Sequence, residues 1–590
     1  MIEKRNLLYS SIMLNINGTE AQIERVDDLP VIFGLLQQMR LQVIIDNVIV
    51  PHGNWQGLSP GWVIVIWLMH ILSEHHHTME PVQAWVGKHM HILHLLTGQE
   101  VRELDFTDDR LALCLFYLHQ QETWTAIEAQ LGATLMRVYD LNKHKVVRLD
   151  ATVGTVQHDP EEHTLFKVGK AKSGQYETQF KMMLASLDPM GLTLVVDVVA
   201  GDRADDPLYV PSYQRMKKVI HLDGLLVVGD SKMSALGTRA VIVEGKDYYL
   251  APLAHLKAEP ELLDELLKPW QGREGEAIRI FLPEDIPSDG SKPNPELAIA
   301  YGFEVSRSRI AVVAKKTVTW NERLLVIRSF SYVKTMQAGL HRRLDKAEAA
   351  LRALTPARQR GKRQITDEAS LCAAIERIEK KYRVQGLFHT SYQRQVQERH
   401  IRGYKGKPGR VERKVCYQLT VTRDEEAIAT AEFKAGWRIY ATNAPAQKLD
   451  LSEAVLAYRD QYIAENVFRR LQGHILSITP VYVQRDDHAQ GLFHLLTLGA
   501  RLLALGDYQA RQALAEEKTE LTGIYLGNAK RGTARPTTER MLKAFENINL
   551  LIMPSEGKAG YYLTRLSSVQ ERILTLLGLP DSLYTDLQVG

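Results

Sequence analysis

The chain has 590 residues, of which 45% are hydrophobic and 24% are charged, and its formal net charge is +3. This composition excludes disordered, fibrous and low-complexity proteins, and the length predicts three or four domains, each with its own core. The three cysteines, Cys114, Cys372 and Cys416, form no CxxC pair, so a reducing cytoplasm is the expected compartment. The longest apolar run, residues 62–69, is about half as long as a bilayer crossing, and we expect neither a membrane span nor a secretion signal.

Residues 1–140 are the first region in chain order, and we expect them to be mainly helical. Asp28 precedes the apolar run LPVIFGLLQQM and Thr107 lies shortly before RLALCLFYLHQ, and both residue types favour the position that caps a helix. Histidines gather at 73–80 and 88–94, which raises the alternative of a zinc site. No HExxH motif accompanies them, so solvated loop histidines are expected instead.

After residue 140 the pattern changes to short runs rich in β-branched residues. Such runs cover residues 145–154, 192–201 and 224–233, and residues 208–220 between the last two are typical of a helix. Nearly continuous apolar strands that alternate with a helix predict a sheet covered on both faces.

A long insertion is expected before the helix that completes this sheet, which we predict at 451–472. The intervening sequence predicts further strands at 241–253, 323–333, 414–424 and 436–443, and charged helices within 338–382. The sheet is therefore interrupted by about two hundred residues.

Positive charge is concentrated in one block of the chain. Residues 341–420 hold 20 Lys and Arg against 8 Asp and Glu, so the remainder of the chain carries a net negative charge. Such a basic block indicates a polyanion partner, although a solvated helical hairpin explains it equally well on charge alone.

Two aspartates follow predicted buried strands. Asp150 comes after the run VVRL and Asp230 comes after LLVVG. A carboxylate at the end of a buried strand is desolvated, which is costly unless a cation meets it. If the two strands are neighbours, the two carboxylates lie close together, and Glu465 from a covering helix would complete a set of oxygen ligands suited to Mg²⁺ or Mn²⁺.

Each of these acids also has an ordinary alternative role as a turn former or a helix cap. Asp197, Asp202, Asp205 and Asp206 are rival candidates, and their spacing alone does not decide between the two sets. The sequence contains no GxxxxGK[ST] phosphate loop, no GxGxxG between a strand and a helix, and no GxSxG elbow. These absences disfavour ATP-driven, dinucleotide-dependent and serine-hydrolase chemistry.

The stretch 457–473, AYRDQYIAENVFRRLQG, resembles the signature of DDE transposases from bacterial insertion sequences, in the insertion-sequence-four-like superfamily. In this Tyr-Arg-Glu-Lys signature group the third acid lies in a Y-x2-R-x3-E-x6-K motif. The corresponding residues are Tyr458, Gln461, Glu465 and Gln472, so the tyrosine and the glutamate match and glutamine stands at the other two positions. A continuous helix would place all four on one face.

Other parts of the chain carry the same resemblance. RLDAT at 148–152 resembles the first catalytic strand of these transposases, and LLVVGDSKMSALGTRA at 225–240 resembles the second. The segment TPVYVQRDDHAQGLFHLLTLGARLL resembles the one that follows their glutamate helix. The resemblance runs from about residue 20 to the C-terminus.

The resemblance implies an α/β protein with a ribonuclease-H-like catalytic domain that is interrupted by a β-rich insertion domain. The implied regions are a helical N-terminal region that binds DNA ends (1–140), the first part of the catalytic domain (141–240), the insertion with its basic helical segment (241–445), the part completed by the glutamate helix (446–505) and a helical C-terminal region (506–590).

The resemblance also implies a DNA transposase that cleaves the ends of an insertion sequence and joins them to target DNA. Asp150, Asp230 and Glu465 are the implied catalytic residues and the ligands of two Mg²⁺ or Mn²⁺ ions. A homodimer that holds two double-stranded DNA ends is expected, in the bacterial cytoplasm at the nucleoid.

DNA contacts are expected from Tyr458, Arg469, Arg470 and Gln472, although an ordinary solvated helix surface is the alternative for each arginine. The basic block at 341–420 and the loop NAKRGTARP at 528–536 are further candidates for binding the DNA backbone.

Two rival classes of function stay open. A catalytically impaired, transposase-derived DNA-binding protein would explain the two glutamines in the signature. A metal-dependent nuclease without strand transfer would use the same carboxylates.

Overall fold

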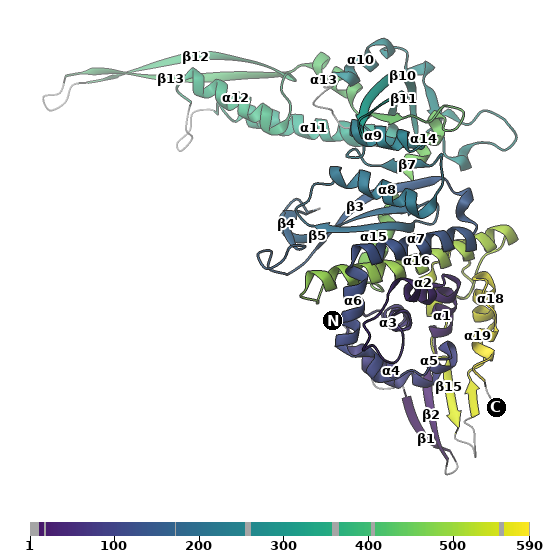
Figure 1. The fold of residues 1–590 in the computed structure, drawn as a ribbon. Coiled ribbons are helices and arrows are strands. Elements are labelled where there is room, and N and C mark those ends of the chain that lie inside the picture. Colours follow the sequence, from purple (N-terminus) through teal and green to yellow (C-terminus); the bar gives the residue numbers. More distant parts are fainter. Residues whose placement is uncertain are drawn as a thin grey trace.

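The computed structural model describes residues 11–588 except residues 17–18, 172, 254–260, 357–364, 403–407 and 554–559. The described part is a mixed α/β protein, in which a central sheet has helices on both sides and a long arm projects from one end (Figure 1).

The central sheet is built around strand β3 (Val146–Thr155). On one side β3 pairs antiparallel with β5 (Tyr176–Leu187), which in turn pairs with β6 (Leu192–Ala200) and the short β4 (Lys167–Lys170). On the other side β3 pairs parallel with β7 (Leu226–Gly229), and β7 pairs parallel with β8 (Tyr248–Pro252). The strands predicted at 145–154, 192–201 and 224–233 are confirmed.

Helices connect the strands around β7. Helix α8 (Tyr209–Ile220) joins β6 to β7 and confirms the helix predicted at 208–220, and α9 (Leu236–Glu244) joins β7 to β8. The prediction of a strand over residues 241–253 was wrong in its first part, because residues 241–244 belong to α9. Their β-branched side chains favour a strand locally, but Ala240 and Ile242 are buried in a helix that packs against β8 and β10.

The predicted insertion supplies four more strands to the same sheet. Beyond β8 the order continues through β14 (Trp437–Thr442), β11 (Lys316–Ser329), β10 (Ala300–Val313) and β9 (Ile278–Ile280). These strands pair antiparallel, and β10 and β11 form a long hairpin. The inserted residues therefore extend the central sheet as well as forming the structures that project from it.

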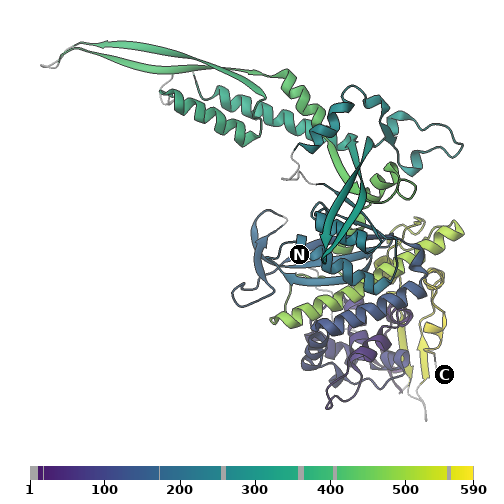
Figure 2. The same ribbon diagram turned by 45° about the horizontal axis from the view of Figure 1, so that its top comes forward.

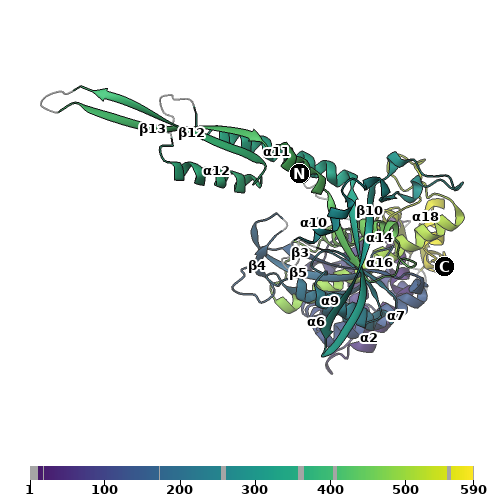
Figure 3. The same cartoon turned by 90° about the horizontal axis from the view of Figure 1, so that it is seen from above.

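The projecting structure consists of two helices and a two-stranded ribbon (Figures 1–3). Its elements are α11 (Phe330–Arg352), α12 (Glu368–Tyr382), β12 (Phe388–Ile401) and β13 (Arg410–Arg423), followed by α13 (Glu425–Lys434). A separate apolar cluster, which includes Leu344, Leu351, Leu371 and Leu419, joins the helices to the base of the ribbon. We refer to β12 and β13 as the arm.

The N-terminal region is mainly helical, as predicted, and packs against one long helix from the C-terminal half. Its helices are α1 (Leu29–Gln38), α2 (Leu41–Val48), α3 (Pro60–Glu74), α4 (Glu80–Lys88), α5 (Met90–Thr97), α6 (Asp108–His119) and α7 (Gln121–Val138). Helix α16 (Asp486–Glu517) contacts α3, α6 and strand β6. Asp28 and Thr107 do stand at helix starts, but neither side chain makes a capping bond.

Helix α16 is long and apolar enough by length and composition to cross a membrane, but 94% of its most apolar window is buried inside the structure. The close packing of α16 on α6 explains one of the glycines in this helix. A Cβ atom at Gly491 would lie 2.0 Å from the carbonyl oxygen of Leu115, so only glycine allows this approach. The apolar sequence of α16 is therefore accounted for by its place in the core.

The two ends of the chain meet in a second sheet, which the sequence analysis did not predict. Strands β1 (Ser11–Ile16) and β2 (Thr19–Arg25) pair with β15 (Asn549–Met553) and β16 (Gly560–Leu563) in the order β1-β2-β15-β16. The remaining helices are α10 (Leu262–Leu267), α14 (Leu451–Arg459), α15 (Tyr462–Gln472), α17 (Thr538–Lys543), α18 (Ser568–Leu576) and α19 (Ser582–Thr585). The terminal regions are thus helical with one shared sheet.

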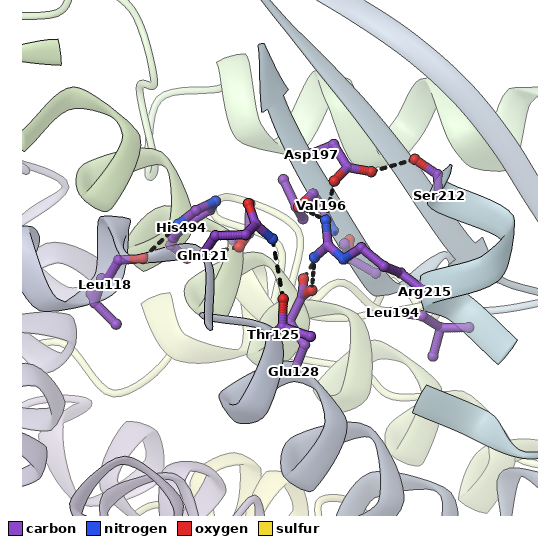
Figure 4. Close-up of polar contacts among 12 residues, drawn as sticks. Leu118, Gln121, Thr125, Glu128, Leu194, Val196, Asp197, Ser212, Arg215 and His494 are labelled. Carbon is purple, nitrogen blue, oxygen red and sulfur yellow. Dashed lines mark hydrogen bonds and ion pairs between the residues drawn. The ribbon is translucent and has the colours of Figure 1, made fainter. Parts of the chain in front are cut away.

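A buried ion network joins the N-terminal helices to the central sheet (Figure 4). Glu128 of α7 is 1% exposed and accepts hydrogen bonds from Val196 N of β6 at 2.9 Å and Arg501 Nη2 of α16 at 3.0 Å. Arg215 of α8 forms ion pairs with both Glu128 and Asp197. Two arginines and two carboxylates therefore balance within the core and link three helices to β6.

We predict that Glu128→Ala lowers the free energy of unfolding by about 3–5 kcal/mol, because it leaves the buried Arg501 without its carboxylate. Chemical denaturation of the full chain measures this change. Glu122→Ala is the matched control, since Glu122 is exposed in the first turn of the same helix and should change stability by less than about 0.5 kcal/mol. Equal stabilities of the two variants would show that the network contributes little.

Candidate active site

The parallel pairing of β3 and β7 brings Asp150 and Asp230 together. Leu149 of β3 is in register with Gly229 of β7, and each aspartate is the next residue along its chain. Adjacent strands lie about 4.8 Å apart, so the two half-buried carboxylates are neighbours at the same end of the two strands. The proximity of the two carboxylates agrees with the expectation from the sequence.

Tyr209, for which the sequence analysis gave no role, holds the second carboxylate. Its hydroxyl donates to Asp230 Oδ1 at 2.6 Å, and Lys232 N donates to the same oxygen at 2.9 Å. Tyr209 lies in the first turn of α8 and is 1% exposed. Burial, followed by the Asp230 carboxylate, raises the pKa of Tyr209 well above its usual value, so the hydroxyl stays protonated and remains a donor.

The predicted continuous helix at 451–472 was wrong, because the chain breaks into α14 and α15 at residues 460–461. The break places Gln461 at the start of α15, where its Nε2 donates to Asp150 Oδ2 at 3.4 Å. Near the other end of α15, Gln472 Nε2 donates to Val153 O of β3 at 3.4 Å. Glu465 is exposed and lies between these glutamines at spacings that put all three on one face of the helix, so this face is turned toward β3.

The structure thus brings two of the three predicted acids together and places the third on the helix beside them. Among the residues that the structure describes, no three Asp, Glu, His or Cys side chains are gathered closely enough to hold a metal ion. The complete three-carboxylate set expected from the sequence is not assembled in this conformation.

Other oxygen atoms around Asp150 nevertheless suit a divalent cation. Within the described part of the chain, Gln461 Oε1 and Thr152 Oγ1 are buried without a hydrogen-bond partner. Thr152 is two residues from Asp150 and shares its face of β3. An unpartnered buried oxygen is costly, and amide, hydroxyl and carboxylate oxygens are the ligands that Mg²⁺ and Mn²⁺ prefer. The donor set therefore fits such an ion.

Tyr458 of α14 lies near the two aspartates. Its ring packs against the ring of Tyr440 in a tilted arrangement, with 4.7 Å between the ring centroids. Burial is the main cause that raises the pKa of Tyr458 to about 12, and the negative charges of Asp230 and Asp150 act in the same direction. The hydroxyl is therefore protonated at neutral pH and can donate a hydrogen bond at this site.

The two arginines predicted to contact DNA differ in their surroundings. Arg469 is exposed. Arg470, whose side chain is 17% exposed, forms ion pairs with Asp507 at 2.8 Å and Glu539 at 2.6 Å. The guanidinium of Arg470 thus links α15 to α16 and α17, and its contact with DNA stays a prediction.

Two of the four rival acids are neutralised by other groups. Asp197 pairs with Arg215 and accepts from Ser212 (Figure 4), and Asp205 pairs with Lys181 and Lys232. The other two rivals, Asp202 and Asp206, are exposed.

The expectation of solvated histidines at 73–80 and 88–94 was only partly right. His77 and His89 are buried. Nδ1 of His89 forms a hydrogen bond with the carbonyl oxygen of Trp85 at 2.7 Å. No metal cluster forms from the described histidines. His77 and His89 are therefore packed side chains of the helical region, whereas His76 and His94 are exposed.

Two protein families match different parts of the chain. A family described as "Domain of unknown function (DUF4277)" matches residues 21–132, and the family "Transposase DDE domain" matches residues 141–503. No curated protein matches the chain.

One solved structure that resembles the chain is a piggyBac transposase synaptic complex with hairpin DNA. It is 7% identical, with 84% of this chain and 77% of that chain covered and a TM-score of 0.33, which is too weak to support an argument.

The transposase match spans more than half of the chain and contains β3, β7, α14 and α15, the elements that position Asp150, Asp230 and Glu465. A domain of this kind is that of an enzyme that cleaves DNA and transfers its strands. The chain belongs to the Transposase DDE domain family.

Proposed function

We propose that this chain is the transposase of a bacterial insertion sequence of the insertion-sequence-four-like superfamily. It cleaves phosphodiester bonds at the ends of the element and joins those ends to target DNA. The observation that supports this most directly is the pairing of Asp150 with Asp230 on adjacent parallel strands, under the helix that carries Glu465.

The order of the sheet supports a ribonuclease-H-like core for this activity. Strands β6, β5 and β3 are antiparallel and β7 and β8 follow parallel to β3, with helices α8 and α9 in the connections. In such a core β8 belongs to the catalytic domain, so the insertion between the second aspartate and the glutamate helix follows Pro252 and does not begin at residue 241.

Divalent ions, when bound, would be held by Asp150, Asp230 and Glu465 and would activate the attacking oxygen and stabilise the leaving oxygen. The remaining side chains position these groups. Tyr209 fixes the rotamer of Asp230, and Gln461 orients Asp150 through one amide atom and leaves its own oxygen available.

A catalytically impaired DNA-binding relative is the alternative, because two signature positions hold glutamine. The contact of Gln461 with Asp150 favours the active enzyme, since the side chain at this signature position still reaches the first acid of the site. We also propose a homodimer on two DNA ends and a place at the nucleoid in the bacterial cytoplasm.

The first prediction concerns the three acids. Asp150→Asn, Asp230→Asn and Glu465→Gln should each abolish Mg²⁺-dependent cleavage of a linear DNA that carries the gene with its flanking sequence, while DNA binding stays near wild type. An amide cannot supply the anionic ligand that the ions need. Cleaved and joined products are measured on gels beside a binding assay. Normal nicking by any one variant would remove that residue from the site, and cleavage without joining would identify a nuclease.

The second prediction concerns Tyr209 as a positioning residue. Tyr209→Phe keeps the ring and removes the donor to Asp230, so it should raise the Mg²⁺ concentration for half-maximal cleavage and slow cleavage by about tenfold, as expected for a hydrogen bond of ~1.4 kcal/mol to a charged group. Tyr213→Phe, on the same helix but bonded to Asp247, is the control. An unchanged Mg²⁺ dependence for Tyr209→Phe would contradict this role.

The third prediction separates the two arginines of α15. Arg470→Ala should lower the unfolding free energy by about 3 kcal/mol, because Glu539 loses its cation and Asp507 keeps only its ion pair with Arg511. Arg469→Ala should leave stability unchanged and reduce the salt dependence of DNA binding by about 0.9, the value for one phosphate contact. If Arg469→Ala has the same salt dependence as wild type, the exposed end of α15 does not contact the DNA backbone.

A further inference from the structure

The arm has two chemically different faces, which follow from its register. Neighbouring residues along a strand point to opposite sides, so cross-strand pairs alternate between the faces. One face holds the pairs Phe388 with Arg423, Thr390 with Val421, Tyr392 with Leu419, Arg394 with Tyr417 and Val396 with Val415. The opposite face holds Ser391 with Thr420, Gln393 with Gln418, Gln395 with Cys416 and Gln397 with Lys414.

The first face is the one that packs on the helices. Tyr417 and Leu419 are buried in the cluster with α11 and α12, and the Tyr392 hydroxyl donates to Glu368 of α12 at 2.7 Å. This contact fixes the orientation of the ribbon. The second face, rich in glutamine, is therefore turned away from the helices.

The glutamine face is exposed and ordered. Gln393, Gln395 and Gln418 are all exposed, and Gln395 Nε2 donates to Gln418 Oε1 at 2.9 Å. A ribbon whose role was packing would place apolar residues on this face. Amides in a row instead present both donors and acceptors at a fixed spacing.

Length and charge limit the kind of partner that this face fits. From Arg394, whose cross-strand partner Tyr417 belongs to the buried base, to Ile401 the ribbon extends for about 24 Å. The two strands hold six Lys and Arg against two Glu, and Arg394, Arg399 and Lys414 are exposed. Such positive charge favours a polyanion and disfavours pairing of two like arms edge to edge.

We propose that the arm lies in the major groove of duplex DNA with its glutamine face toward the base edges. The inference rests on the proposed function for the identity of the polyanion. The major groove is about 12 Å wide and admits a two-stranded ribbon, and glutamine can pair with adenine through N6 and N7. The lysine and arginines along the ribbon contact the flanking phosphates. This assigns to the arm a DNA contact outside the catalytic core.

Shortening the arm tests whether it binds DNA at all. Residues 395–416 are replaced by an Asn-Gly turn, which retains the pair of Arg394 with Tyr417 and the buried base. The full chain without this segment should bind a linear duplex at least tenfold more weakly, with a salt dependence lower by about 0.9 for each phosphate that the arm no longer binds. Equal affinity and salt dependence would overturn the proposal.

The two faces are then compared by substitution. The triple variant Gln393→Ala, Gln395→Ala and Gln418→Ala should weaken binding about tenfold, whereas Val396→Thr with Val411→Thr, two residues that are each 48% exposed on the other face, should change it less than twofold. Circular dichroism checks that the ribbon still folds. Loss of affinity in the valine variant alone would overturn the assignment of the face.

The groove is tested with modified DNA. A duplex whose cytosines carry glucosylated hydroxymethyl groups, which fill the major groove, should bind the wild-type chain as weakly as the shortened chain. A minor-groove ligand, netropsin, should have little effect. The reverse pattern would overturn the proposal, as would DNA-independent dimers of the wild-type chain that the shortened chain does not form.

The Asp150→Asn variant separates this inference from the proposed function. If the chain is a transposase and the arm binds DNA, Asp150→Asn loses cleavage and keeps arm-dependent affinity. Arm-dependent affinity without cleavage by the wild-type chain would contradict the proposed function and leave the arm inference standing.

Discussion

The parallel pairing of β3 with β7 is the constraint on which the rest of this structure depends. It sets two carboxylates side by side at the end of buried strands, where their mutual repulsion and desolvation oppose folding unless other groups compensate. The hydroxyl of Tyr209 and the amide of Gln461 supply neutral donors to Asp230 and Asp150. Neutral donors of this kind orient a carboxylate without placing a positive charge beside it.

The elements around this pair form a rigid frame. Glu128, Arg215 and Arg501 join α7, α8 and α16 to β6, and Arg470 ties α15 to the C-terminal helices. Buried ion pairs between α7 and the central sheet therefore connect the two regions of the chain that the families match, 21–132 and 141–503. Glu465 is exposed on α15, the helix that follows the break at residues 460–461.

The sequence predicts the parts of the fold whose local preference agrees with their tertiary setting. Strands β3 and β6 are rich in valine and leucine and were predicted at nearly their observed bounds, whereas β7 covers only residues 226–229 of the predicted 224–233. Strand β5 was missed, because KMMLASL favours a helix locally and becomes a strand only by pairing between β3 and β6. Residues 241–244 show the opposite case, in which β-branched residues form a helix. Asp150 and Asp230 could be predicted because each comes directly after an apolar strand. The roles of Tyr209 and Gln461 could not, because they depend on contacts between distant segments.

The central claim is that Asp150, Asp230 and Glu465 share one cation site. Fe²⁺ can replace Mg²⁺ and, with peroxide, generates hydroxyl radicals that cut the polypeptide near the place where the metal is bound. We expect cuts at the ends of β3 and β7 and in the first turn of α15, all abolished when Mg²⁺ is added in excess or when Asp150 is changed to Asn. Cuts confined to other parts of the chain, or cuts at only one of these three places, would contradict it.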